Sequence, residues 1–419
     1  MRSKSDKKKP LVPSLRFPEF REAGAWEKKR LGTQGGFLTP LSGKSAKDFD
    51  TGDAKFIPYM NVFSNTFTDI QDLRSVIITD DESQNAVAKG DVFFTVSSET
   101  PEEAGMSSVL LGDVDRCYLN SFCALFRFDD HLSPNLIFLG YLLRSRSVRC
   151  HLSRGAQGAT RYNISKLVFK ELPLVFPLAK EQQKIAHCLS SLDEVIGLQA
   201  KKVQALKQHK KGLMQQLFPA EGETTPRLRF PDFREAGAWE VKYGNSLFIQ
   251  ISNKEHNASL PVLAITQENG AIPRHLIDYH VSVTEKSLKS YKVVDIGDFI
   301  ISLRTFQGGI EYSDYKGICS PAYIVLRAAT EEVINDFFRH YFKTEKYIAD
   351  LNRNLEGLRD GKMVSYKQFS EIKLPLPISP EQQKIAHCLS SLDEVIGLES
   401  HKLDALKNLK KGLMQQLFP

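Results

Sequence analysis

The sequence lacks the features of membrane-spanning, secreted and disulfide-rich proteins. No apolar run approaches the ~20 consecutive residues that a membrane-spanning helix needs. The basic N-terminus is followed by Pro10 and Pro13 rather than by an apolar stretch, so it does not resemble a secretory signal. Its six cysteines have no paired spacing typical of a zinc site. We therefore expect a cytoplasmic protein with no membrane partner, in which residues 1–13 form a basic tail.

The common catalytic motifs are also missing. The sequence contains no Walker-type phosphate loop, no H-E-x-x-H and no G-x-S-x-G. Residues 320–323 (Ser-Pro-Ala-Tyr) resemble the catalytic tetrapeptide of adenine methyltransferases but lack its second proline. Residues 306–309 (Phe-Gln-Gly-Gly) have the wrong spacing for a methyl-donor loop. We predict a chain that is not an enzyme, with no catalytic residues, no metal site and no cofactor of its own.

The charge balance is only mildly basic. A net charge of +6 and a pI of about 8.8 permit a nucleic-acid partner without requiring one, because the distribution of charge matters more than its total. The length of 419 residues suggests two or three domains at the usual ~100–200 residues per domain.

Two long internal repeats are the strongest signal in the sequence. Residues 15–26 (LRFPEFREAGAW) recur at 228–239 with one substitution. Residues 181–219 recur at 381–419 with seven differences. The regions between them, 27–180 and 240–380, share only sparse landmarks, such as the Gly-Asp pairs at 90–91 and 297–298. Two nearly identical scaffolds with unlike bodies suggest that each scaffold meets the same partner while each body meets a different one. Recombination that copied only the flanks is the alternative.

The repeated C-terminal segments have the period of a coiled coil. Apolar residues are spaced alternately by four and three over about five heptads, with Gln199 and Lys210, or Glu399 and Lys410, at the remaining seam positions. The predicted packing residues are Ile185, Leu189, Leu192, Ile196, Val203, Leu206, Leu213 and Leu217 in the first helix, and Ile385, Leu389, Leu392, Ile396, Leu403, Leu406, Leu413 and Leu417 in the second.

A single helix of this length with a narrow apolar stripe is not stable alone in water, so we expect the two copies to pack on each other, antiparallel, as a rigid spacer. Ser379 is a candidate N-cap for the second helix, with Gln382 in a capping-box position.

The bodies between the repeats have the pattern of mixed α/β domains. Strands are predicted at 92–96, 124–128, 299–303 and 323–326, and helices at 136–143 and 333–342. We predict an α/β fold class with two globular domains separated by the two helices, internally duplicated with pseudo-two-fold symmetry. The boundaries are 1–13 for the tail, 14–178 and 220–378 for the domains, and 179–219 and 379–419 for the helices.

Polar loops at matched places in the two bodies are suited to DNA. Arginine, asparagine, glutamine and threonine read base edges or bind phosphate oxygens, and glycines let such loops approach the duplex. An ordinary exposed loop is the alternative for any one residue. The candidates are Ser97, Ser98, Thr100, Arg154, Gln157, Thr160, Arg161 and Asn163 in the first body, and Arg304, Thr305, Gln307, Arg353, Asn354, Arg359 and Lys362 in the second.

Taken in order, these segments resemble the specificity subunit of type I restriction-modification systems. The resemblance rests on the LRFP…W opening, the Gly-Asp strand, the Leu-Pro-Leu-Pro run at 374–377 and the EQQKIA helix starts at 181 and 381, and it covers nearly the whole chain. Residues 158–164 fit the Gly-x-Thr-rich loop of the family, whereas the second body departs from it at 357–362.

The resemblance implies that each recognition domain reads one half of a bipartite site in double-stranded DNA, and that the helices set the spacer. It also implies two methyltransferase (modification) subunits that use S-adenosylmethionine, and two restriction subunits that use ATP and Mg²⁺. Two rival hypotheses stay open on the residues alone: a coiled-coil adaptor between proteins, and a DNA methyltransferase or nuclease with an unrecognised site.

Overall fold

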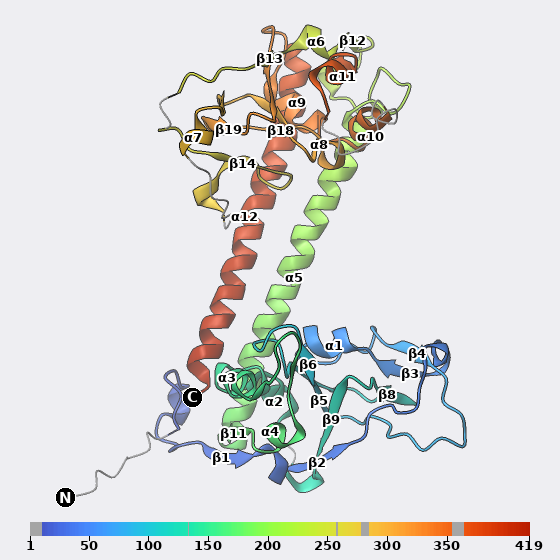
Figure 1. Ribbon diagram of the computed structural model, residues 1–419, viewed down its shortest axis with the longest axis vertical. Helices are drawn as coiled ribbons and strands as arrows, with labels where there is room; N and C mark the ends of the chain where they lie inside the picture. Colours follow the sequence, from blue (N-terminus) through green and yellow to red (C-terminus); the bar gives the residue numbers. More distant parts are fainter. Residues whose placement is uncertain (1–10, 133, 257–258, 278–284, 354–363) are drawn as a thin grey trace, which may run out of the picture. The chain divides into compact units, whose positions relative to one another are not determined.

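The computed structural model describes residues 11–132, 134–256, 259–277, 285–353 and 364–419. The chain divides into two compact units, residues 1–199 with 402–419 and residues 200–401 (Figure 1). Each unit therefore takes one body together with one stretch of each long helix. The boundaries predicted from the sequence lie at the ends of the long helices, whereas this division falls inside them.

The body of the first unit is built on a four-stranded antiparallel sheet of order β2-β9-β5-β7 and a smaller sheet of order β4-β3-β8. Helices α2 and α3 and the short α4 complete it (Figure 1). Its strands are β1 (Glu27–Arg30), β2 (Gly35–Leu38), β3 (Phe49–Ile57), β4 (Arg74–Val76), β5 (Val92–Thr95), β6 (Ser97–Ser98), β7 (Ser107–Val109), β8 (Cys117–Leu119), β9 (Cys123–Phe128), β10 (Tyr162–Asn163) and β11 (Pro173–Phe176). Its helices are α1 (Tyr59–Ser64), α2 (Leu136–Leu143), α3 (Arg146–Gly155) and α4 (Lys166–Lys170).

The body of the second unit repeats the four-stranded sheet in the same order along the chain, β13-β20-β17-β18. Its strands are β12 (Glu240–Tyr243), β13 (Phe248–Ile251), β14 (Leu263–Thr266), β15 (Gly270–Pro273), β16 (Lys292–Val294), β17 (Phe299–Ile301), β18 (Glu311–Tyr312), β19 (Gly317–Cys319), β20 (Ile324–Ala328) and β21 (Lys373–Leu376). Its helices are α6 (Gly244–Leu247), α7 (Glu285–Leu288), α8 (Thr305–Gly308), α9 (Asn335–Tyr341), α10 (Glu345–Arg353) and α11 (Tyr366–Ser370). The mixed, duplicated α/β fold predicted from the sequence is confirmed.

The shared Gly-Asp landmark has a structural role that is the same in both bodies. Gly90 and Gly297 have φ of +91° and +92°, a conformation that glycine adopts without strain. The aspartate that follows is buried and forms a bidentate ion pair with an arginine on the neighbouring strand, with all four distances at 2.7 Å. The pairs are Asp91 with Arg127 and Asp298 with Arg327. The landmark therefore fixes the central strand of each sheet.

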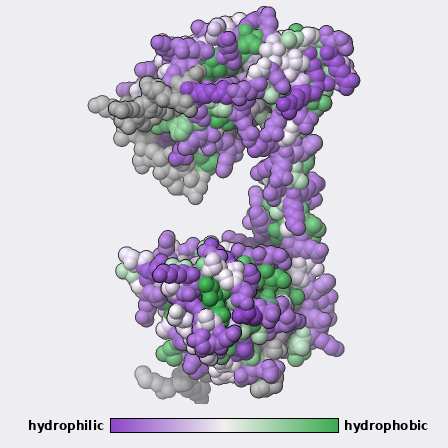
Figure 2. All heavy atoms as spheres, turned by 90° about the vertical axis from the view of Figure 1, so that its right-hand side faces the viewer, coloured by the Kyte–Doolittle hydropathy of each residue, from purple (hydrophilic) through white to green (hydrophobic). Residues whose placement is uncertain are grey.

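Helices α5 (Ala179–Leu217) and α12 (Ser379–Leu417) run antiparallel within each unit. In the second unit Lys202 bonds to Glu399 and Lys210 to Asp393, so the residue number rises along one helix as it falls along the other. In the first unit Lys410 bonds to Asp193 in the same register. On the face shown in Figure 2 the helices carry mainly hydrophilic side chains, as expected for a narrow apolar seam.

The predicted seam residues are the less exposed ones of each helix. Ile185, Leu189, Val203 and Leu217 are buried on α5, as are Ile385, Leu389 and Leu417 on α12, and the other predicted positions are half-buried. Gln199, which interrupts the apolar pattern, is also buried. The lysines at the other breaks reach across to the aspartates of the partner helix, so these breaks specify register, as polar residues in a coiled-coil seam do.

In each unit the opening repeat contacts the repeated sequence of the long helices. Arg16 donates to both carboxylate oxygens of Glu181 at 2.8 and 2.7 Å, and Arg229 binds Glu381 in the same way at 2.7 Å. The amide of Leu15 bonds to the carbonyl of Gln416 at the end of α12. The equivalent bond in the second unit joins residues 228 and 216, at the end of α5. Each opening segment thus binds the start of one long helix and the end of the other within its own unit.

The expected cap at Ser379 is wrong, because Ser379 is already the first residue of α12. The carbonyl of Ile378 accepts the first intrahelical bonds, from the amides of residues 381 and 382, so Ile378 and not Ser379 occupies the cap position. Gln382 instead joins the body to the helix: its amide donates to the carbonyls of Glu332 and Pro377, and its oxygen accepts from the amide of Ile334. Gln182 does the same in the first unit through Pro177 and Asn135.

Candidate nucleic-acid interface

The two polar segments proposed in the first body lie side by side. Strand β10 pairs antiparallel with β6, with Tyr162 opposite Ser98 and Asn163 opposite Ser97. The turn is closed by reciprocal backbone bonds between Gln157 and Asn163 at 2.9 and 2.8 Å. Of the candidates in this body, the exposed ones are Thr100, Arg154, Gln157, Thr160, Arg161 and Asn163, whereas Ser98 is buried and Ser97 half-buried.

Two half-buried arginines hold the segments beside this polar surface in place. Arg144 donates to the carbonyls of Ser107, Val62, Phe63 and Asn65, at 2.8 to 3.0 Å. Burial lowers the pKa of its guanidinium to about 10, so it stays charged at neutral pH. Such a charge is tolerated inside a protein only when its donors are satisfied, as these are by backbone oxygens.

Arg149 does the same for the loop that follows β6. It donates to the carbonyls of Glu102 and Ala104 at 2.7 and 2.6 Å, and burial lowers its pKa to about 10 as well. The segment between β6 and β7, which carries the exposed candidate Thr100, is therefore fixed by the Arg149 side chain from α3.

A cavity of about 480 Å³ opens beside the paired β6 and β10 strands. Its wall combines aromatic and apolar side chains with charged ones. The rings of Tyr59 and Phe63 stack with centroids 5.9 Å apart, and Phe122 is 65% exposed. The lining residues are Tyr59, Met60, Phe63, Ser97, Ser98, Glu99, Glu103, Phe122 and Arg161.

The candidates of the second body lie around the short helix α8. Arg304 and Gln307 are exposed. Thr305 is only 1% exposed, and its hydroxyl accepts the amide of Ser302, so it shapes the turn and does not lie on the surface. Arg353, at the end of α10, forms ion pairs with Glu221 and Asp350. The candidates Asn354, Arg359 and Lys362 lie outside the described residues.

A second cavity, of about 620 Å³, lies beside α8 and the hairpin of β14 and β15. It includes Ser302 and Arg304 together with polar residues that the sequence analysis did not select, Thr266, Gln267 and Asn269. The side-chain amide of Gln267 donates to the carbonyl of Arg304 at 3.3 Å, so hairpin and helix are tied together at the rim. At its wall Glu311 is 2% exposed and bonds Lys343 through one oxygen, and burial raises the pKa of this carboxyl.

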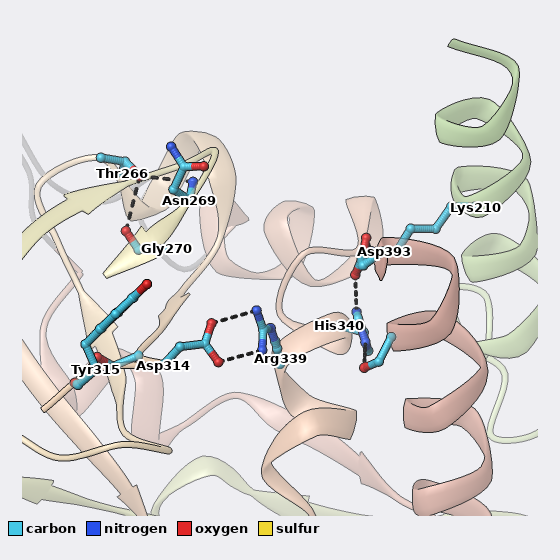
Figure 3. Close-up of polar contacts among 11 residues, drawn as sticks. Lys210, Thr266, Asn269, Gly270, Asp314, Tyr315, Arg339, His340 and Asp393 are labelled. Atoms are coloured by element: carbon cyan, nitrogen blue, oxygen red, sulfur yellow. Dashed lines mark hydrogen bonds and ion pairs between the residues drawn. The ribbon is translucent and has the colours of Figure 1, made fainter. Parts of the chain in front are cut away.

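The bodies contact the same helix positions through different side chains. In the first unit the Tyr141 hydroxyl donates to Asp193 at 2.7 Å, and Lys410 binds the same carboxylate. In the second unit His340 takes the place of the tyrosine: its Nε2 lies 3.1 Å from the Ser390 hydroxyl and its Nδ1 3.8 Å from Asp393 (Figure 3). Burial, reinforced by the charges of Lys210 and Arg339, lowers the pKa of His340 to about 3.

Sequence reasoning missed the aromatic part of the first cavity and the hairpin of the second. Tyr59, Phe63 and Phe122 are apolar residues in unremarkable contexts, which a periodicity analysis assigns to the core. The cavity draws them from separate segments, so only the folded arrangement reveals it. One signal was available: Asn269-Gly270 is a hairpin dipeptide between two apolar runs, and it marks the turn between β14 and β15.

Within the described ranges, no group of three or more His, Cys, Asp or Glu side chains is arranged to hold a metal ion. No helix there is long and apolar enough to cross a bilayer.

The family model for the type I restriction modification DNA specificity domain matches residues 26–208 and again residues 240–408. A chain with this duplicated fold and two unlike polar surfaces thus falls into a class of DNA specificity proteins. The chain belongs to this family and carries its domain twice.

Individual relatives agree with this assignment. The MjaX specificity subunit of Methanocaldococcus jannaschii is 28% identical over 299 residues, which cover 67% of this chain and 66% of that one, slightly less than two thirds of its length. The type I restriction enzyme MjaVIII specificity subunit of the same organism is 26% identical, covering 67% of this chain and 69% of that one.

Solved structures share the fold. The S subunit of a type I restriction-modification system from M. genitalium has a TM-score of 0.56 at 17% identity, covering 98% of this chain and 99% of its own. A chain from a structural study of complex assembly and conformational transition of the type I R-M system also has a TM-score of 0.56. It is 15% identical and covers 94% of this chain and 97% of its own.

Proposed function

We propose that this chain is the sequence-reading subunit of a type I restriction-modification complex. Each body reads one half of a bipartite site in double-stranded DNA, and the paired helices set the spacing between the half-sites. The chain performs no chemistry itself. Two modification subunits supply methyl transfer from S-adenosylmethionine to adenine, and two restriction subunits supply ATP- and Mg²⁺-dependent cleavage.

One observation carries this proposal: the two units repeat the same scaffold contacts while the polar surfaces of their bodies differ. The Arg–Glu pair at the helix start, the bond to the helix end and the Gly-Asp turn are formed twice. The cavities, by contrast, are lined by different side chains. Identical scaffolds suit two copies of one partner subunit, and unlike surfaces suit two different DNA sequences.

The test is to co-express the chain with its modification subunit and to map methylated adenines across the host genome. The expected result is a split motif with a fixed spacer. Methylation without a split motif, or none despite a stable complex, would favour the adaptor hypothesis. Methylation or cleavage by the purified chain alone would overturn the assignment of chemistry to the partners.

DNA binding itself is tested by its dependence on salt. Contacts to phosphates release counterions, so the affinity of a purified complex should fall steeply as salt rises. A control duplex without the motif should bind with the same salt slope but more weakly. A DNA affinity that does not respond to salt would contradict direct readout by these bodies.

A further inference from the structure

Each body has a cavity at the same place in its fold. Both lie where the strand after the Gly-Asp turn ends, and include Ser97 or Ser302. Both also include the residue directly before the strand that pairs with β5 or β17. This residue is Phe122 before β9 and Tyr323 before β20. The frame of the cavity is therefore shared, while most of its lining is not. In a duplicated protein, a shared cavity with unlike linings is where the two copies distinguish different ligands.

The first cavity carries two opposite charges at its rim. Glu99 and Arg161 both line it and both are exposed. In the part of the chain that the structure describes, neither side chain forms an ion pair or a hydrogen bond. Glu103, by contrast, is held by the hydroxyls of Ser98 and Thr100, at 3.2 and 2.9 Å.

An exposed carboxylate on a surface that approaches DNA is repelled by the phosphates, so it is retained at a cost unless it recognises a base. A glutamate accepts a hydrogen bond from the amino group of cytosine, and an arginine donates to the two acceptors of guanine in the major groove. Glu99 and Arg161 therefore complement the two bases of one G·C pair.

The second cavity offers amides. Asn269 lies at the tip of the β14–β15 hairpin, where the Thr266 hydroxyl accepts from the backbone amide of Asn269 and donates to the carbonyl of Gly270 (Figure 3). These bonds fix the turn without using the side-chain amide of Asn269. Gln267 is held beside it, packed over Gly308, where an added Cβ would lie 2.7 Å from the Gln267 side chain.

Asparagine and glutamine amides match the paired donor and acceptor of adenine in the major groove. Resting on the proposed function, we infer that each cavity is the base-reading site of its body. The first selects a G·C pair through Glu99 and Arg161, and the second selects an A·T pair through the side-chain amide of Asn269.

The test uses the full chain in complex with its modification subunit and a pool of duplexes randomised across the motif. Methylated products of the wild type, Glu99→Gln and Asn269→Ala are sequenced. The matched control is Glu102→Gln, which makes the same change at an exposed neighbour that does not line the cavity. Complex formation, measured by gel filtration, checks that each variant folds.

We expect Glu99→Gln to reduce the preference for one G·C pair by about 5- to 150-fold, the usual range for loss of a specific base contact. It should leave the other half-site unchanged. Asn269→Ala should relax one A·T position in that other half-site, and Glu102→Gln should retain the wild-type motif.

The inference is overturned if Glu99→Gln retains every preference of the wild type, or if both variants relax the same half-site. Its failure differs from that of the proposed function. A wild-type complex that gives no split motif overturns both, whereas an intact split motif that no cavity variant alters overturns this inference alone.

Discussion

Replacing Arg16 with methionine removes one partner of the buried ion pair that joins the opening segment to α5. The side chains of Arg16 and Glu181 are 6% and 1% exposed, and the guanidinium also donates to the carbonyl of Gly24 at 2.7 Å. The substitution leaves the Glu181 carboxylate buried without its cation. It also leaves the Gly24 carbonyl without this donor.

The magnitude follows from that burial. Removing one member of a buried pair costs about 3–5 kcal/mol, because the remaining charge is uncompensated. With a urea dependence of about 2 kcal/mol/M, the midpoint of unfolding of the first unit should fall by about 1.5–2.5 M. Replacing Arg16 and Glu181 together by methionine should recover most of this loss, because an apolar pair often substitutes for a buried ion pair at little cost.

The chain provides its own assay. It contains only two tryptophans, Trp26 in the first unit and Trp239 in the second, and each is 4% exposed. In a Trp239→Phe background the fluorescence of Trp26 reports the first unit alone. The matched control is Arg229→Met in a Trp26→Phe background, which breaks the equivalent pair with Glu381 and should lower the midpoint reported by Trp239 instead.

A shift below about 0.5 M for Arg16→Met in that background would refute the reasoning, because such a value is typical of an exposed pair. An equal loss for the single and the double substitution would also contradict it. It would mean that the apolar stems of the side chains, and not their charges, stabilise the junction.

Three further predictions concern other parts of the chain. The folded-state pKa of His340 lies below the unfolded value of ~6.5, so protonation favours unfolding, and the second unit should lose about 2 kcal/mol between pH 7.5 and pH 5. His340→Gln should remove that loss as followed by Trp239, and retention of the slope in this variant would contradict the assignment. Exposed Cys150 should be alkylated by iodoacetamide at pH 8 far faster than Cys123, because burial raises the pKa of the Cys123 thiol to about 12; equal rates by mass spectrometry would disprove this. Adding one heptad to both long helices should lengthen the permitted DNA spacer by about 3 bp, since seven residues add roughly 10.5 Å, and an unchanged spacer in the methylation map would exclude the helices as a ruler.

The sequence predicted the elements that depend on repetition and period. The seam of α5 and α12, and the strands that follow the Gly-Asp turns, could be located because apolar spacing reports directly which face is buried. The observed strands end earlier than predicted, at Thr95 and Ile301. The predicted ranges also took in Val96 and Leu303, apolar residues that lie one and two positions past the ends of these strands.

Some polar residues of the cavities could be predicted from the sequence, but the aromatic ones could not. The polar residues were selected from their chemistry, and strand pairing does bring 97–98 and 162–163 together. The aromatic wall of the first cavity comes from segments far apart in the chain, and no local pattern links Tyr59 to Phe122. Thr305 was selected wrongly for the opposite reason. Its residue type suggested DNA contact, but its hydroxyl accepts a hydrogen bond from the amide of Ser302 in the local turn.

Strand β1 pairs with β11 over four residues, from Glu27 opposite Phe176 to Arg30 opposite Pro173, and β12 pairs with β21 in the same way. Each body therefore begins and ends on adjacent strands, beside the start of its long helix. A segment whose two ends meet can be exchanged as a unit, because an incoming body joins the chain through one short two-stranded ribbon. Recombination between the two near-identical flanks, or with another gene that carries them, would thus create a new DNA preference in a single event and leave the contacts between the opening segments and the long helices in place.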